Sequence, residues 1–133
     1  MTIISPDVTQ NKMTSSTSKI EVTNPSVTGN HHTIYINSVE PVLPDVGFIT
    51  YAPTKCEIVL LDVRDAYQKM GYGAQLFDLA LQNMKECPVV TGSAKRGAVE
   101  FYRSLGAELL KPLSSNWYGL VPMSIQNKYY QKK

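Results

Sequence analysis

The sequence predicts an α/β (α+β) fold with a mixed, mostly antiparallel sheet and a central strand–helix–strand unit. Residues 33–37 alternate apolar and polar side chains, as half-buried strands do. Residues 46–51 are mostly β-branched and aromatic, which favours a second strand. Residues 58–63 form a nearly continuous aliphatic run, which is typical of a central strand covered on both faces. Apolar residues then recur at helical spacing over 74–86, and a short strand is expected at 89–91.

The remaining elements are a second helix and two closing strands. Ala98, Phe101, Tyr102 and Leu105 fall on one face of a helix expected over 95–105. Strands at 107–110 and 117–121 follow it. Residues 1–30 are rich in Ser, Thr and Asn. We expect them to be a flexible N-terminal arm or an edge strand, placed at 19–23, ahead of a domain over 31–133.

Composition excludes several classes of protein. With 133 residues, 43% hydrophobic and 18% charged, the chain is expected to form one soluble domain. A formal charge of +2 does not favour nucleic acid or a membrane surface, and neither a signal peptide nor an apolar run of about 18–20 residues is visible. We therefore expect a cytoplasmic protein.

The cysteines and histidines do not indicate a metal site. Cys56 and Cys87 lie 31 residues apart, without CxxC or Cys/His ligand spacing. We expect two reduced thiols rather than a disulfide or metal ligands. The adjacent His31 and His32 would point to opposite faces of a strand, so we interpret them as surface residues.

A loop with two glycines joins the expected central strand to the first helix. Gly71 and Gly73 let the backbone approach a ligand closely, and the free N–H groups at a helix start favour an anion. By itself this pattern also fits an ordinary strand-to-helix turn. It matches neither GxGxxG nor GxxxxGK[ST], so dinucleotide and P-loop sites are excluded. The candidate phosphate-binding residues are Gln68, Lys69, Met70, Gly71, Tyr72, Gly73 and Ala74.

Two motifs in the right order resemble the GCN5-related N-acetyltransferases. Gln68-x-x-Gly71-x-Gly73-Ala74 is similar to the Q/R-x-x-G-x-G/A loop of that family. The segment 98–107 is similar to its A-x-x-F-Y-x-x-x-G-F/A helix. With the strand that leads into the loop, the resemblance covers about fifty residues.

The resemblance implies acetyl-CoA as co-substrate, without a metal. It places the pyrophosphate on the glycine loop and the pantetheine arm against the backbone of Leu61, Asp62 and Val63. It also implies that Tyr102 protonates the departing thiolate, which suits a phenol with a pKa of about 10. Lys95 replaces an asparagine that often holds the arm, and could instead reach a CoA phosphate.

Two departures from the family pattern concern the acceptor. A glutamate base is expected near Val59, and Glu57 lies two residues earlier, roughly 6–7 Å away on the same strand face, close enough to act through a water. Asp62 is expected on the opposite face. The helices that usually precede residues 33–51 are missing, which favours an open acceptor site and a homodimer. Residues 106–117 thinly resemble the diamine acetyltransferase branch, but the charge balance opposes a polycation.

The leading hypothesis is an N-acetyltransferase that moves an acetyl group from acetyl-CoA to a primary amine by direct attack. The amine would belong to a small molecule or a peptide. Neither cysteine lies in the motifs, which disfavours a covalent acyl-enzyme. The alternative is a catalytically reduced domain of the same fold that binds acyl-CoA or a protein partner without turnover. A plain interaction module would require both motif matches to be accidental.

Overall fold

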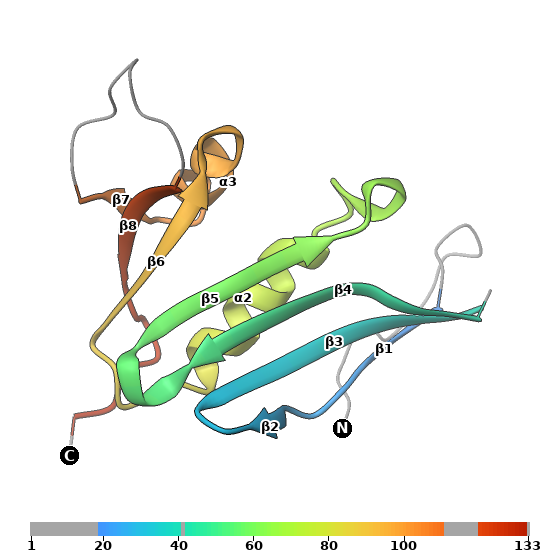
Figure 1. Ribbon diagram of the computed structural model, residues 1–133, viewed down its shortest axis with the longest axis horizontal. Helices are drawn as coiled ribbons and strands as arrows, with labels where there is room; N and C mark the ends of the chain where they lie inside the picture. The colour runs from blue at the N-terminus through green and yellow to red at the C-terminus, as the bar shows by residue number, and fades with distance from the viewer. Residues whose placement is uncertain (1–18, 41, 111–119, 133) are drawn as a thin grey trace.

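The computed structural model describes residues 19–40, 42–110 and 120–132. Eight strands form a single sheet in the order β1-β3-β4-β5-β6-β8-β7, with β2 also paired to β3. Figure 1 shows the two longer helices α2 and α3 beside this sheet. Every strand pair is antiparallel except β5 with β6. The predicted fold class is therefore confirmed.

The N-terminal part of the sheet consists of four strands, β1 (Lys19–Val22), β2 (Ser26–Thr28), β3 (His31–Glu40) and β4 (Val42–Ala52). Both predicted strands in this region are present and longer than expected. β1 pairs with β3, so residues 19–22 do lie at a sheet edge. The rest of the expected arm before residue 19 lies outside the described part of the chain.

The central unit consists of β5 (Glu57–Val63), α2 (Tyr72–Gln82) and β6 (Val89–Lys95). The short 3-10 helices η1 (Pro53–Lys55) and η2 (Asp65–Tyr67) flank β5. α2 buries the apolar stripe that the helical spacing predicted, with Leu76, Phe77, Ala80 and Leu81 facing the sheet. This stripe packs into one core with buried side chains of β3, β4 and β6.

The C-terminal elements differ in their bounds from the prediction. Lys95 ends β6, and the expected second helix is divided into the 3-10 helix η3 (Arg96–Ala98) and α3 (Val99–Ser104). Two closing strands follow, β7 (Glu108–Leu109) and β8 (Leu120–Gln126). Most of the connection between them, and residues 117–119 of the predicted last strand, lie outside the described residues.

The expectation that β5 is covered on both faces is wrong. Val59 and Leu60 are 41% and 51% exposed. The two helices lie on the same side of the sheet, since the rings of Phe77 on α2 and Tyr102 on α3 are 5.9 Å apart. Within the described ranges no helix covers the other face, which is called the open face below. An aliphatic run signals burial but cannot show that a covering element is present.

The expectation of two reduced thiols is also wrong, because Cys56 and Cys87 form a disulfide. Their Cα atoms are 5.6 Å apart, although 31 residues separate them in sequence. The crossover through α2 returns the chain beside its starting point, so the two cysteines meet just before the adjacent strands β5 and β6.

A cytoplasmic location stays a prediction. None of the described helices has the length and apolar character needed to cross a bilayer.

Candidate functional site

The central feature of the site is a split between the parallel strands β5 and β6. They pair only at Glu57 with Thr91 and at Ile58 with Gly92. Beyond this point each strand continues without pairing to the other, and Figure 1 shows the two strands diverging. Backbone groups along the two facing edges are consequently available to an inserted chain.

A β-bulge on β5 lies directly beside the end of this pairing. Thr50 of β4 pairs with Leu60 and Tyr51 pairs with Ile58, so Val59 has no partner in that strand pair. One extra residue bends a strand and increases its local twist. The bulge therefore provides a physical reason why β5 turns away from β6 immediately after Ile58.

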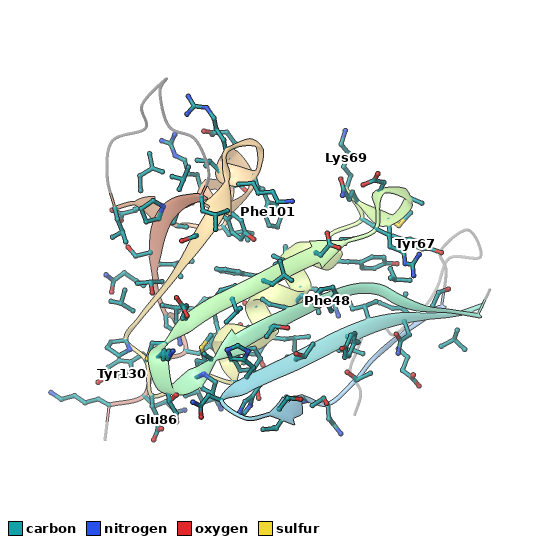
Figure 2. The ribbon with its side chains drawn as sticks, in the orientation of Figure 1. Phe48, Tyr67, Lys69, Glu86, Phe101 and Tyr130 are labelled. Atoms are coloured by element: carbon teal, nitrogen blue, oxygen red, sulfur yellow. A yellow bond between two sulfur atoms is a disulfide. The ribbon has the colours of Figure 1, made fainter. Side chains whose placement is uncertain are left out.

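The glycine loop lies where the outer end of β5 leads into α2. Gly71 is the residue before the helix and has φ 85°, in the left-handed region where glycine is favoured. Lys69 also has a positive φ of 67°. For a residue with a side chain this conformation costs about 1–2 kcal/mol, and such strain is concentrated at functional loops. Lys69 and Met70 are exposed, and Figure 2 shows Lys69 extending from the loop.

The N-terminus of α2 is not capped by a side chain. The first helical hydrogen bond runs from the Gln75 N–H to the Gly71 carbonyl at 3.0 Å. The N–H groups of Tyr72, Gly73 and Ala74 therefore precede that bond and have no acceptor within the helix. No acidic side chain lies in the first turn. The positive end of the helix dipole is thus open to an anion.

Gln68 stabilises the loop through its side chain. Its Nε2 donates to the Val63 carbonyl at 3.0 Å and to Asp65 Oδ1 at 3.2 Å. The end of β5 is therefore tied to the start of the motif. This gives Gln68 a role in shaping the loop that the sequence motif did not reveal, and it occupies the Val63 carbonyl.

Phe101 joins α3 to the glycine loop. A Cβ placed on Gly73 would lie 3.1 Å from Cζ of the Phe101 ring. Gly73 is helical with ordinary dihedrals, so a close approach rather than backbone freedom explains this glycine. Figure 2 shows Phe101 on α3, at the level of the split. The motif contained Phe101, but only the packing of α3 against α2 shows what it contacts.

Tyr102 lines a small cavity at the base of the split, on the helix side of the sheet. The cavity is bounded by Ile58 and Gly92, the last residues that pair, and by Phe77 of α2. The Tyr102 ring contacts Phe101 edge-on with a centroid distance of 5.1 Å. Burial raises the pKa of the Tyr102 phenol above its usual value, so the hydroxyl keeps its proton at neutral pH.

Glu57 does not share the face of Tyr102. In β4, Ala52, Thr50 and Phe48 alternate to one face, and they pair with Glu57, Leu60 and Asp62. Ile58 belongs to the buried helix side. The predicted acid and the candidate base therefore lie on opposite faces of the sheet, beside the same split.

The expectation that Asp62 points away from the face of Glu57 is wrong. It assumed uninterrupted alternation along β5, and the bulge at Val59 shifts the alternation by one residue. Leu61 and Val63 are half-buried and pack against the core on the helix side, whereas Asp62 is exposed.

Lys95 lies at the outer end of β6, and its side chain is exposed. It alternates with the buried Ala94, which places it on the open face rather than beside the helix start. The described residues contain no group of His, Cys, Asp and Glu side chains that could hold a metal ion.

The sequence and the fold match those of known proteins. An acetyltransferase (GNAT) domain model matches residues 4–127. No curated protein matches the chain. Among solved structures, nourseothricin acetyltransferase is 17% identical with a TM-score of 0.58, over 74% of this chain and 66% of that one. Tetrahymena GCN5 is 18% identical with a TM-score of 0.59, over 78% and 72%.

A chimera of the Vibrio cholerae spermidine N-acetyltransferase is 13% identical with a TM-score of 0.57, over 76% of this chain and 70% of that one. These identities show a common fold and no more. This chain spans just under two thirds of the nourseothricin acetyltransferase chain. The family model, by contrast, covers nearly the whole sequence. The chain therefore belongs to the GNAT family of acetyltransferases.

Proposed function

We propose that this protein transfers an acetyl group from acetyl-CoA to a primary amine. One observation carries the proposal: the split between β5 and β6 has a protonated phenol at its base and an uncapped helix N-terminus at its outer end. A thioester on a long arm that leads to a diphosphate matches these two features in that order.

The residues of the loop suit the diphosphate. The N–H groups of Tyr72, Gly73 and Ala74 would donate to its oxygens, and the left-handed backbone at Lys69 and Gly71 turns further amides outward. Met70 and the Lys69 side chain would flank it. The edge of β5 at Leu61 and Asp62 would pair with the amides of the arm, while Gln68 holds the Val63 carbonyl in place. The Lys95 side chain lies on the open face and not beside the loop. It would therefore contact a phosphate of CoA only from the open face.

Tyr102 acts as the general acid in this proposal. The amine nitrogen attacks the thioester carbonyl carbon, the carbon–sulfur bond breaks, and the leaving sulfur takes the phenolic proton. The raised pKa of Tyr102 keeps that proton available. No cysteine is left as a nucleophile in the described chain, because both are in the disulfide.

Glu57 would accept the amine proton through a water. Glu57 lies on the open face, at the closed end of the split, where β5 and β6 still pair. Tyr102 lies at the same end but on the helix side of the sheet. This arrangement lets acetyl-CoA enter from the helix side and the acceptor from the open face. The acceptor side has no covering helix among the described residues, so the substrate would be a small amine or an exposed peptide amine.

The test is binding followed by turnover. Gly71→Glu puts a negative charge where the diphosphate is proposed to lie. Gly29→Glu is a matched control, because Gly29 also has a positive φ, of 60°, and open space around it. In calorimetry with acetyl-CoA, wild type and Gly29→Glu should bind and Gly71→Glu should not. Equal binding of both variants would contradict the site.

Release of free CoA thiol with a panel of primary amines then tests the reaction. Thiol release that depends on the amine supports transfer. Binding of acetyl-CoA without any amine-dependent release would instead favour a domain that binds without turnover.

We also expect a homodimer, formed through the exposed edge of β1 and β2. A monomer in sedimentation at micromolar concentrations would contradict this.

A further inference from the structure

The Cys56–Cys87 disulfide lies where the split between β5 and β6 closes. Cys56 is the residue before β5, and Cys87 lies two residues before β6. The Thr91 N–H donates to the Cys56 carbonyl at 2.9 Å, and only two residue pairs then join the strands, up to Gly92. Figure 1 shows β5 and β6 converging at this end. The disulfide is therefore next to the whole of the short stretch that holds the two strands together.

Cys56 has a backbone conformation that is unfavourable for a residue with a side chain. Its φ is 52°, in the left-handed region, where it ends the 3-10 helix η1. Crowding between Cβ and the backbone makes this region costly for residues other than glycine. The disulfide offsets this cost, because it fixes the Cys56 side chain against Cys87. Without the bond, Cys56 is free to leave the left-handed region, and its carbonyl then turns away from the Thr91 N–H.

The surroundings of the bond also suit the reduced form. The Pro53 carbonyl oxygen lies 3.4 Å from Cys87 Sγ and 3.7 Å from Cys56 Sγ. Each free thiol would therefore have an acceptor at this oxygen, as a weak donor. Cys87 is 2% exposed and Cys56 is half-buried, so a reductant reaches the bond at Cys56. We therefore expect the reduced protein to stay folded, with a looser closed end of the split.

We propose that this disulfide is a redox switch, which sets how far β5 and β6 separate and thereby the affinity of the split for acetyl-CoA. The oxidised form binds acetyl-CoA more tightly, because the bond holds the base of the split in place. The inference rests on the proposed acetyl-CoA site and adds a regulation to it.

A dithiol reductant turns the switch. One thiolate of the dithiol attacks Cys56 Sγ, the sulfur–sulfur bond breaks, and Cys87 leaves as a thiolate. The second thiol then attacks the mixed disulfide and releases Cys56. The dithiol is oxidised to a disulfide, the two cysteines are reduced, and the two protons of the dithiol pass to them.

Calorimetry with acetyl-CoA compares the oxidised protein with protein that has been reduced by dithiothreitol and then freed of it. Reduction should lower the affinity about three- to tenfold, which corresponds to the loss of roughly one net hydrogen bond. Equal affinity of the two forms would overturn the switch. Unfolding of the reduced protein would also overturn it, since the bond would then be purely structural.

Amide hydrogen exchange reports on the split without any ligand. The Thr91 amide should exchange faster after reduction, because its acceptor at Cys56 is released. The Arg64 amide is the control. It donates to the Val46 carbonyl at 2.9 Å, beyond the outer end of β5, and its exchange should not change. An unchanged Thr91 amide would contradict the switch.

Two double variants separate the backbone of residue 56 from the loss of the cross-link. Cys56→Ala with Cys87→Ala and Cys56→Gly with Cys87→Ala both lack the bond and differ by one methyl group. Glycine adopts the left-handed region without steric cost, so the glycine variant should bind acetyl-CoA about threefold more tightly than the alanine variant. Dithiothreitol should alter neither. Equal affinities of the two variants would exclude the backbone of residue 56 as the coupling element and overturn the switch.

Thermodynamic linkage separates this inference from the proposed function. If the disulfide favours acetyl-CoA binding, acetyl-CoA must favour the disulfide by the same factor. Saturating acetyl-CoA should therefore shift the equilibrium with oxidised and reduced dithiothreitol toward the disulfide. If acetyl-CoA binds neither form while Thr91 exchange still depends on reduction, the transferase proposal fails and the control of the split stands. If acetyl-CoA binds both forms equally, the acetyl-CoA site stands and the switch fails.

Discussion

The ring of Phe101 lies so close to Gly73 that a Cβ on residue 73 would be 3.1 Å from its Cζ atom. Gly73→Ala should therefore destabilise the protein by about 1 kcal/mol in the wild-type background, because the ring must shift. In a Phe101→Ala background the same change should stabilise by up to about 1 kcal/mol, since alanine favours the helix more than glycine does. Denaturant unfolding of the four proteins measures this double-mutant cycle. Equal effects in both backgrounds would exclude coupling between the two residues.

Tyr102→Phe should separate catalysis from packing. It keeps the ring against Phe77 and Phe101 but removes the phenolic proton. Turnover should fall by about 10²–10⁴-fold, while stability should change by only about 1 kcal/mol. Steady-state rates and acetyl-CoA calorimetry provide the measurement, with Tyr130→Phe, at a 42% exposed tyrosine, as the control. A variant that loses stability but keeps its turnover would make Tyr102 a packing residue.

The disulfide should contribute much of the stability. It closes a loop with a sequence separation of 31 residues, for which the chain-entropy model gives about 3–4 kcal/mol. Cys56→Ser with Cys87→Ser, or a dithiol reductant, should lower Tm accordingly. The Thr91 N–H donates to the Cys56 carbonyl at 2.9 Å. The disulfide at Cys56 therefore also helps to hold β5 and β6 together at the closed end of the split. An unchanged Tm under reducing conditions would show that the two thiols are not bonded in solution.

Burial of Tyr51 should make the free energy of unfolding fall at alkaline pH. Its side chain is fully buried, its hydroxyl has no hydrogen-bond partner in the described structure, and burial raises its pKa to about 12. The unfolded state releases this proton near pH 10 and the folded state does not. The contribution of Tyr51 to the free energy of unfolding is therefore present below pH 10 and is lost as the pH rises from about 10 to 12.

Tyr51→Phe isolates this effect. It should remove that part of the alkaline decline and, at pH 7, stabilise the protein by about 1 kcal/mol, because an unsatisfied buried hydroxyl is costly. Unfolding curves at pH 7 and pH 11 test both expectations. A destabilised variant with the same alkaline decline as wild type would mean that the hydroxyl is satisfied, for example by a water.

Local sequence patterns determined much of the fold. Four patterns identified their elements: the alternation at 33–37, the β-branched and aromatic residues at 46–51, the aliphatic run at 58–63 and the helical stripe of α2. Residue type and side-chain period both reflect backbone geometry. The position of the glycine loop was indicated by backbone conformation instead, since Gly71 must adopt a left-handed backbone that few other residues tolerate. The role of Tyr102, by contrast, was implied only by the resemblance of two motifs to a known family, and no local pattern showed that its helix meets the loop.

Only the tertiary structure decided which face each residue occupies and which distant residues meet. A single extra residue at Val59 places Asp62 on the face of Glu57, and no periodicity along one strand can reveal a bulge that depends on the partner strand. The Cys56–Cys87 bond and the Phe101–Gly73 contact likewise require the α2 crossover and the packing of α3. Sequence spacing encodes local conformation, whereas these contacts depend on how complete elements return to one another in space.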